Sequence, residues 1–189
     1  MVWLSRIRHC RGFGVQSPTD YRFVRYVINE HYPYYRYTEL ADELQLHDSD
    51  LRKYCELFFR LSNFLQSRYF IHIFPESDIV DRYVTAACQK TTVVRIEGQD
   101  TDIQLNDAGP LLVKISYDEG VKKYVDVLIR HAADGTIIVL DKIKQNNVVW
   151  KYWQSLTQGK RVGAAYDLYY CGIIIFDNRR YKKKYIINF

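Results

Sequence analysis

The stretch from Tyr69 to Ile96, YFIHIFPESDIVDRYVTAACQKTTVVRI, decides the fold of this chain. It begins with a short apolar run, Tyr69–Phe74, and ends with a second one, Thr92–Ile96. Runs of this length and composition are typical of strands buried on both faces. Between them, apolar residues recur at the spacing of one helix face: Ile79, Val80, Tyr83, Val84 and Ala87. Strand, helix and strand in this order predict a parallel pair joined by a right-handed crossover.

The same alternation continues downstream. Leu111–Ile115 and Thr136–Leu140 are further apolar runs of strand length, and a helical pattern from Val121 to Leu128 lies between them. After a helix expected over 148–156, three strand-like segments follow with gaps too short for helices: Arg161–Leu168, Gly172–Phe176 and Lys184–Phe189. We therefore predict a mostly parallel α/β sheet that ends in an antiparallel meander.

The first third of the chain is predicted to be helical. Ser17-Pro18-Thr19-Asp20 combines a capping hydroxyl, a proline at the first helical position and an acid, which predicts a helix over about 18–31. Further helices are expected over about 38–46 and 49–66. The last of these has a predicted buried face: Leu51, Tyr54, Phe58, Leu61 and Leu65. We expect a single domain with a helical part, 1–67, and a sheet part, 68–189.

The composition is that of one compact globular protein. With 189 residues and 48% hydrophobic content, the chain is long enough to bury about 70% of its surface, so disordered and fibrous classes are excluded. A net charge of +5 is small for a nucleic-acid binder. The four cysteines are scattered without a CxxC pair, so we expect a reduced, cytoplasmic protein. No apolar stretch reaches 18 residues, so we expect no membrane partner.

Several short motifs, taken in order along the chain, carry a resemblance to a known family. They are Arg11–Pro18 (RGFGVQSP), Leu57–Leu61 (LFFRL), Ile96–Gly98 (IEG), Ile138–Ile143 (IVLDKI), Trp153, Ala165–Tyr169 (AYDLY), Gly172–Phe176 (GIIIF) and Tyr185–Phe189 (YIINF). The set resembles class I S-adenosylmethionine-dependent methyltransferases of a Bacteroidetes-type group, in a divergent and shortened form. The resemblance covers most of the chain and is weakest between residues 98 and 135. It implies a Rossmann-like methyltransferase fold with a reversed strand near the C-terminus, and S-adenosylmethionine bound at the carboxyl ends of the strands.

The loop after the first predicted strand is where the resemblance places the cofactor. Relatives carry an acid and two glycines there, because the chain must pass close to the methionine and ribose. This chain has no glycine between Gly14 and Gly98. The candidate cofactor-binding residues in the segment are His72, Phe74, Glu76, Ser77 and Asp78. Phe74 adds bulk, and the two acids at a helix start favour capping, so we expect an ordinary strand-to-helix connection in preference to a cofactor loop. His72 is the one histidine expected near the pocket, with either a chemical role or a place in the core.

Three further candidates follow other predicted strands. Glu97 stands where an acid binds the ribose hydroxyls in this fold. Ser116 follows the strand at 111–115, where relatives have an Asp-Gly pair. Asp141 retains one member of an acidic pair whose other member is replaced by Lys142, so we expect no metal. No catalytic base or nucleophile can be named from the sequence.

The connection between the second and third predicted strands is short. After Glu97, only thirteen residues, Gly98 to Pro110, precede the third strand, so we expect one crossover helix to be missing. Asp102–Leu105 could form a short edge strand. The sheet face left bare near the first two strands is then expected to be covered by the N-terminal helices or by a second subunit.

Three functional hypotheses follow. The first is a methyltransferase-like protein with a degenerate site, in which S-adenosylmethionine binding is weak or lost, catalysis is impaired, and the chain acts through contacts with another copy or another protein. The second is an active methyltransferase of unknown acceptor that uses Glu97 and Asp141. The third is a module for nucleic acid or another acidic partner, built on the basic run Arg179–Lys184 with Arg6, Arg8 and Arg11. A solvated turn is the favoured interpretation of that run, so we do not expect a nucleic-acid partner.

Overall fold

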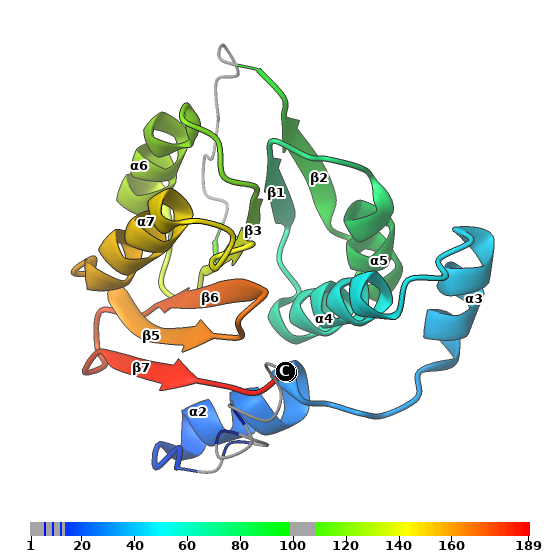
Figure 1. Cartoon of the computed structure of the whole chain (residues 1–189), viewed down its shortest axis with the longest axis horizontal. Helices are drawn as coiled ribbons and strands as arrows, with labels where there is room; N and C mark the ends of the chain where they lie inside the picture. The colour runs from blue at the N-terminus through cyan, green and yellow to red at the C-terminus, as the bar shows by residue number, and fades with distance from the viewer. Residues whose placement is uncertain (1–5, 7–8, 10–11, 13, 99–108) are drawn as a thin grey trace.

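The computed structural model of the chain describes residues 6, 9, 12, 14–98 and 109–189. These residues form a sheet of seven strands between two layers of helices (Figure 1). The strands are β1 (Tyr69–Ile73), β2 (Thr92–Ile96), β3 (Leu112–Ile115), β4 (Ile137–Asp141), β5 (Val162–Asp167), β6 (Cys171–Phe176) and β7 (Lys183–Ile186). Their order across the sheet is β2-β1-β3-β4-β6-β5-β7.

The pairing of the strands confirms a mostly parallel, Rossmann-like α/β sheet with a reversed strand near the C-terminus. Strands β2, β1, β3 and β4 are parallel to one another, and β6 is antiparallel to both β4 and β5. The predicted C-terminal meander is wrong, because β7 pairs with β5 in parallel and not with β6. Both edges of β6 are already hydrogen-bonded to β4 and β5, so β7 takes the outer edge of β5.

Helices cover the two faces of the sheet. One face packs against α2 (Pro18–Phe23), a π-helical turn η2 (Val24–Ile28), α4 (Ser49–Leu65) and α5 (Ile79–Ala87). The helix α3 (Tyr35–Glu43) lies at the outer edge of this layer (Figure 1). The other face packs against α6 (Val121–His131) and α7 (Asn147–Gln158). The predicted helices are therefore all present, with ends that differ by a few residues.

One prediction about the N-terminal helices needs correction. Leu51 was expected to be buried, but it is 36% exposed, because the first turn of α4 extends past the sheet over a cavity described below. The N-terminal helices were also expected to cover a sheet face near the first two strands, and they pack beside α5 on the face that includes Phe70 of β1.

The segment that decides whether a crossover helix is missing lies outside the described residues, as does the possible edge strand Asp102–Leu105. Cover by a second subunit stays a prediction. Within the described ranges, none of the helices has the length and apolar character needed to cross a bilayer.

Candidate functional site

Polar side chains stand in a row across the middle of the parallel part of the sheet. In the strand register, His72 of β1 is the partner of Arg95 on β2 and of Lys114 on β3. Paired residues of neighbouring parallel strands project from the same face, here the face covered by α4 and α5. A row of this kind in a buried sheet needs polar partners, because unpaired buried polar groups are destabilising.

Asp81 of α5 supplies the partner for two members of this row. Its Oδ1 lies 2.6 Å from Nδ1 of His72, and Arg95 donates to its Oδ2 at 2.6 Å. Burial alone would raise the pKa of Asp81, but the hydrogen bonds from His72 and Arg95 hold it below its ordinary value. Burial lowers the pKa of His72, and the Asp81 carboxylate opposes that shift only in part.

The second nitrogen of His72, Nε2, has no hydrogen-bond partner among the residues that the structure describes. The residue is 1% exposed, and Nε2 is a buried atom without a hydrogen bond among the described residues. Because Nδ1 faces a carboxylate, it carries the proton of the neutral ring, so Nε2 presents a lone pair. Each buried polar atom without a partner calls for an explanation, and a ligand in the adjoining cavity is one.

The third member of the row belongs to a second cluster. Lys114 Nζ lies 2.6 Å from Oδ2 of Asp141 and 3.2 Å from Oγ of Ser116. The Tyr54 hydroxyl donates to the other carboxylate oxygen of Asp141. Burial lowers the pKa of Lys114 to about 8 and raises the pKa of Asp141 well above its ordinary value. The close contact opposes both shifts, since each charge stabilises the other.

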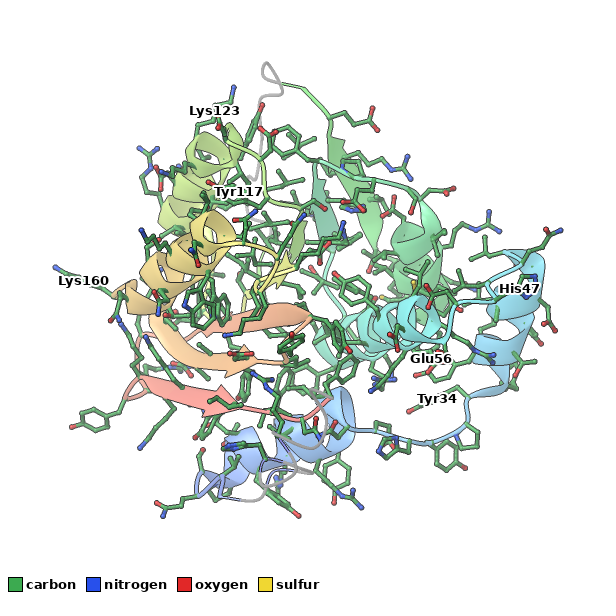
Figure 2. The ribbon with its side chains drawn as sticks, viewed as in Figure 1. Tyr34, His47, Glu56, Tyr117, Lys123 and Lys160 are labelled. Atoms are coloured by element: carbon green, nitrogen blue, oxygen red, sulfur yellow. The ribbon has the colours of Figure 1, made fainter. Side chains whose placement is uncertain are left out.

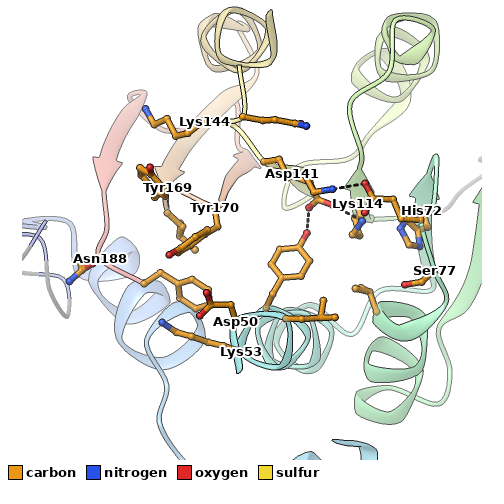
Figure 3. Close-up of a pocket in the computed structure, with 18 of the residues that line it drawn as sticks. Asp50, Lys53, His72, Ser77, Lys114, Asp141, Lys144, Tyr169, Tyr170 and Asn188 are labelled. Atoms are coloured by element: carbon orange, nitrogen blue, oxygen red, sulfur yellow. Dashed lines mark hydrogen bonds and ion pairs between the residues drawn. The ribbon is translucent and has the colours of Figure 1, made fainter. Parts of the chain in front are cut away.

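A cavity of about 600 Å³ opens over these two clusters, at the carboxyl ends of β1, β3 and β4 (Figure 3). Its floor includes His72, Lys114 and Asp141. Its walls come from the start of α4, the loops after β1 and β4, and the segments after β5 and β7: Asp50, Leu51, Lys53, Tyr54, Glu76, Ser77, Lys142, Lys144, Tyr169, Tyr170, Asn188 and Phe189. The start of α4 is held in place by its cap, because Asp48 accepts hydrogen bonds from the backbone of Asp50 and Leu51 at 2.8 and 3.2 Å.

Five of the eight predicted site residues lie at this cavity. His72, Glu76, Ser77 and Asp141 line it, and Ser116 adjoins it, with its hydroxyl 3.4 Å from Oδ2 of Asp141. Glu76 does not cap α5 as expected, because its carboxylate pairs with Lys142 Nζ at 2.6 Å. The two loops that follow β1 and β4 are thereby joined at the cavity mouth.

The other three predicted residues do not line the cavity. Phe74 packs on the opposite side of the sheet, with its ring centroid 5.9 Å from that of Tyr124. Asp78 occupies the residue before α5, but its side chain makes no capping hydrogen bond, so the capping expectation is wrong here too. Its backbone ψ of 0° differs from the ψ of 115° of the extended cap residue Asp48. Glu97 is 68% exposed in its side chain and reaches only Arg95, at 4.0 Å.

Three residues of the site were missed by sequence reasoning: Tyr54, Asp81 and Lys114. Lys114 carries a detectable signal, because it interrupts the apolar run Leu111–Ile115 in a strand buried along its whole length. Asp81 and Tyr54 carry no such signal in the sequence. Each occupies an ordinary helix position, and its partners lie on other elements: β1 and β2 for Asp81, and the end of β4 for Tyr54.

The terminal basic residues are largely engaged within the chain. Arg180 forms an ion pair with the buried Asp20. Lys182 and Lys184 donate to the end of α7, to Gln158 O at 2.7 Å and to Thr157 Oγ1 at 2.9 Å. At the other end, Arg6 pairs with Asp167 at 2.6 Å, while Arg8 and Arg11 lie outside the described residues. These contacts favour a structural role for the run.

The groups on the cavity floor are of the kinds used in acid–base chemistry. Over the part of the chain that the structure covers, no three His, Cys, Asp or Glu residues are grouped so as to hold a metal ion. The cavity floor instead combines a neutral imidazole nitrogen with a buried amine beside a carboxyl group. These are the groups that general acid–base and nucleophilic catalysis require.

Comparisons of the chain with protein-family models and with curated proteins found no match. The structure therefore establishes the α/β, Rossmann-like fold, and the methyltransferase family stays a prediction from the residues quoted above. The cavity at the carboxyl ends of the strands stands as the candidate functional site on its own geometry.

Proposed function

We propose that this chain is a methyltransferase-like protein whose S-adenosylmethionine site is closed, and that it functions without methyl transfer. The observation that carries the proposal is the conformation of Phe74, the first residue after β1. Its φ of 53° lies in the left-handed region that favours glycine, at the place where the resemblance implies a glycine-rich loop. A phenylalanine there keeps the backbone shape and fills the space that a glycine would leave open.

The surroundings of Phe74 support the same conclusion. Its ring packs on Tyr124, and its Cζ lies 3.8 Å from the point where a Cβ on Gly120 would stand. The ring thus occupies the space between the ends of β1 and β3. Glu97, the expected ribose ligand, is exposed and faces Arg95. These residues do not fit a cofactor that has to lie against the loop backbone.

Thermal unfolding with and without 1 mM S-adenosylmethionine tests the proposal. A ligand at about 100 times its dissociation constant stabilises a protein by about 2.7 kcal/mol, which for a chain of this size raises Tm by roughly 5–10 °C. We expect no shift. A shift in the native chain that Glu97→Ala abolishes would instead overturn the closed site and favour the active methyltransferase.

A second candidate function is protein contact through the N-terminal helices. Three tyrosines of this region are strongly exposed: Tyr26, Tyr32 and Tyr35, at 62%, 67% and 80%. Tyrosine is enriched in protein–protein interfaces, where its ring is buried and its hydroxyl stays hydrogen-bonded. We propose a second copy of the chain as the partner. Light scattering of the native chain should then give the mass of a dimer, and replacing the three tyrosines by serine should give the mass of a monomer. A monomer mass for the native chain at both low and high protein concentration would refute this proposal.

A further inference from the structure

The cavity floor contains two groups that the proposed function leaves unused, Nε2 of His72 and Nζ of Lys114. They stand on neighbouring strands as register partners, so their side chains lie next to each other, about 4.8 Å apart at the backbone. His72 is held by Asp81, and Lys114 is held by Asp141 and Ser116. Both groups line the same cavity of about 600 Å³.

The environment of Lys114 suits it to act as a nucleophile. Only a neutral amine can attack an electrophile, and burial brings the pKa of this amine to about 8. At pH 7 about a tenth of it is then neutral, against about 0.03% for an ordinary lysine. The side chain is 6% exposed, so the cavity is its route to a reactant.

We propose that Lys114 forms an imine with an aldehyde or ketone that carries a negative charge. The nitrogen lone pair forms a bond to the carbonyl carbon, and the C=O electron pair moves to oxygen, which takes a proton. The nitrogen then loses one proton, the hydroxyl group takes a proton and leaves as water while the C=N bond forms, and the nitrogen loses its second proton. Amine and carbonyl compound thus give imine and water, with no oxidant or reductant.

The neighbouring residues can carry the protons of these steps. Nε2 of His72 has a free lone pair and can accept the proton that the nitrogen loses. Asp141 touches Lys114 at 2.6 Å and can deliver a proton to the departing hydroxyl. The Tyr54 hydroxyl, which donates to Asp141, keeps that carboxyl in position.

The negative charge of the ligand is inferred from Lys53 of α4. This lysine lines the cavity, and none of the ion pairs among the described residues includes it. Its Nζ lies 4.4 Å from the ring centroid of Phe189. Figure 3 shows Lys53 on the opposite side of the cavity from Lys114, so a carbonyl group at one end and an anion at the other fit this arrangement.

Reductive trapping on the full chain tests this inference. The probe is pyridoxal 5′-phosphate, which has an aldehyde on one ring carbon and a phosphate on a methylene arm at the neighbouring carbon, and cyanoborohydride reduces any imine formed. Peptide mass spectrometry then gives the labelling rate of each lysine. We expect Lys114 to be labelled at least tenfold faster than Lys160, which is exposed and points outward beyond α7 (Figure 2). Labelling of Lys160 with Lys114 unlabelled would overturn the proposal.

Two matched comparisons test the details. Replacing the probe by uncharged pyridoxal, or Lys53 by methionine, should each slow the labelling of Lys114 and leave Lys160 unchanged. If Lys114 is labelled equally fast by both probes and in both chains, the ligand does not need a negative charge. His72→Gln should slow Lys114 labelling at least about tenfold at pH 7, whereas an unchanged rate would exclude His72 from the proton transfers. None of these readouts uses S-adenosylmethionine, so failure here leaves the closed-site proposal standing.

Discussion

The ion pair between Lys114 and Asp141 allows a direct energetic test of the site. Lys114→Met keeps most of the volume of the side chain but leaves the Asp141 carboxyl, which is 8% exposed, without its charged partner. Removing one member of a buried pair costs about 3–5 kcal/mol, because a buried charge is left uncompensated. At roughly 2–4 °C per kcal/mol for a chain of this size, Tm should fall by roughly 6–20 °C.

The loss should also depend on pH. Without Lys114 the pKa of Asp141 stays raised by burial, so the folded state binds a proton that the unfolded state releases. The loss of stability that Lys114→Met causes should therefore be smallest at low pH and grow as pH rises above about 4 through the raised pKa. A loss that instead shrinks over this range would contradict the assignment of a buried, desolvated carboxyl.

A double-mutant cycle separates this pair from general damage to the core. Urea unfolding at pH 7 of Lys114→Met, Asp141→Asn and the double variant gives the coupling energy between the two side chains. We expect the double variant to be clearly more stable than the sum of the single losses implies, with a coupling of about 2–3 kcal/mol. Additive losses, within about 0.5 kcal/mol, would refute the reasoning.

Three further variants test the rest of the structure. Gly172→Ala should lower stability by about 1–3 kcal/mol in urea unfolding, because the added Cβ would lie 2.5 Å from the ring of Trp153; an unchanged midpoint would contradict that close packing. Burial lowers the pKa of His72, so the native chain should lose stability as pH falls below about 6.5, where the unfolded chain binds a proton that the folded chain does not. His72→Gln should not show this loss. If the free energy of unfolding changes equally with pH in both chains from pH 7.5 to 5, this reasoning is contradicted. Burial alone would raise the pKa of Asp20, but hydrogen bonds from two tyrosine hydroxyls and a guanidinium hold it below the ordinary value. Asp20→Asn should therefore lower the free energy of unfolding by about 1–3 kcal/mol at pH 7, and by less as pH falls below about 4. A loss of stability that grows as pH falls would contradict this reasoning.

The candidate site was only partly visible in the sequence. His72, Glu76, Ser77 and Asp141 were found because they follow or interrupt strands whose carboxyl ends must meet in a parallel sheet. Lys114 could have been found by the same reasoning, as a charge within a buried strand. The partners that give these residues their chemistry come from helices, and a helix position reveals nothing about which distant strand it will face.

The sequence by itself determined the elements and their general order. Tyr69–Ile73 and Thr92–Ile96 are strands because their apolar runs suit a buried sheet, and α4 begins after Asp48 because a carboxylate caps its first turn. Only the tertiary structure decided which edge β7 takes and which groups line the cavity. Strand pairing and side-chain contacts depend on surfaces from distant parts of the chain, and local periodicity carries no information about how those surfaces meet.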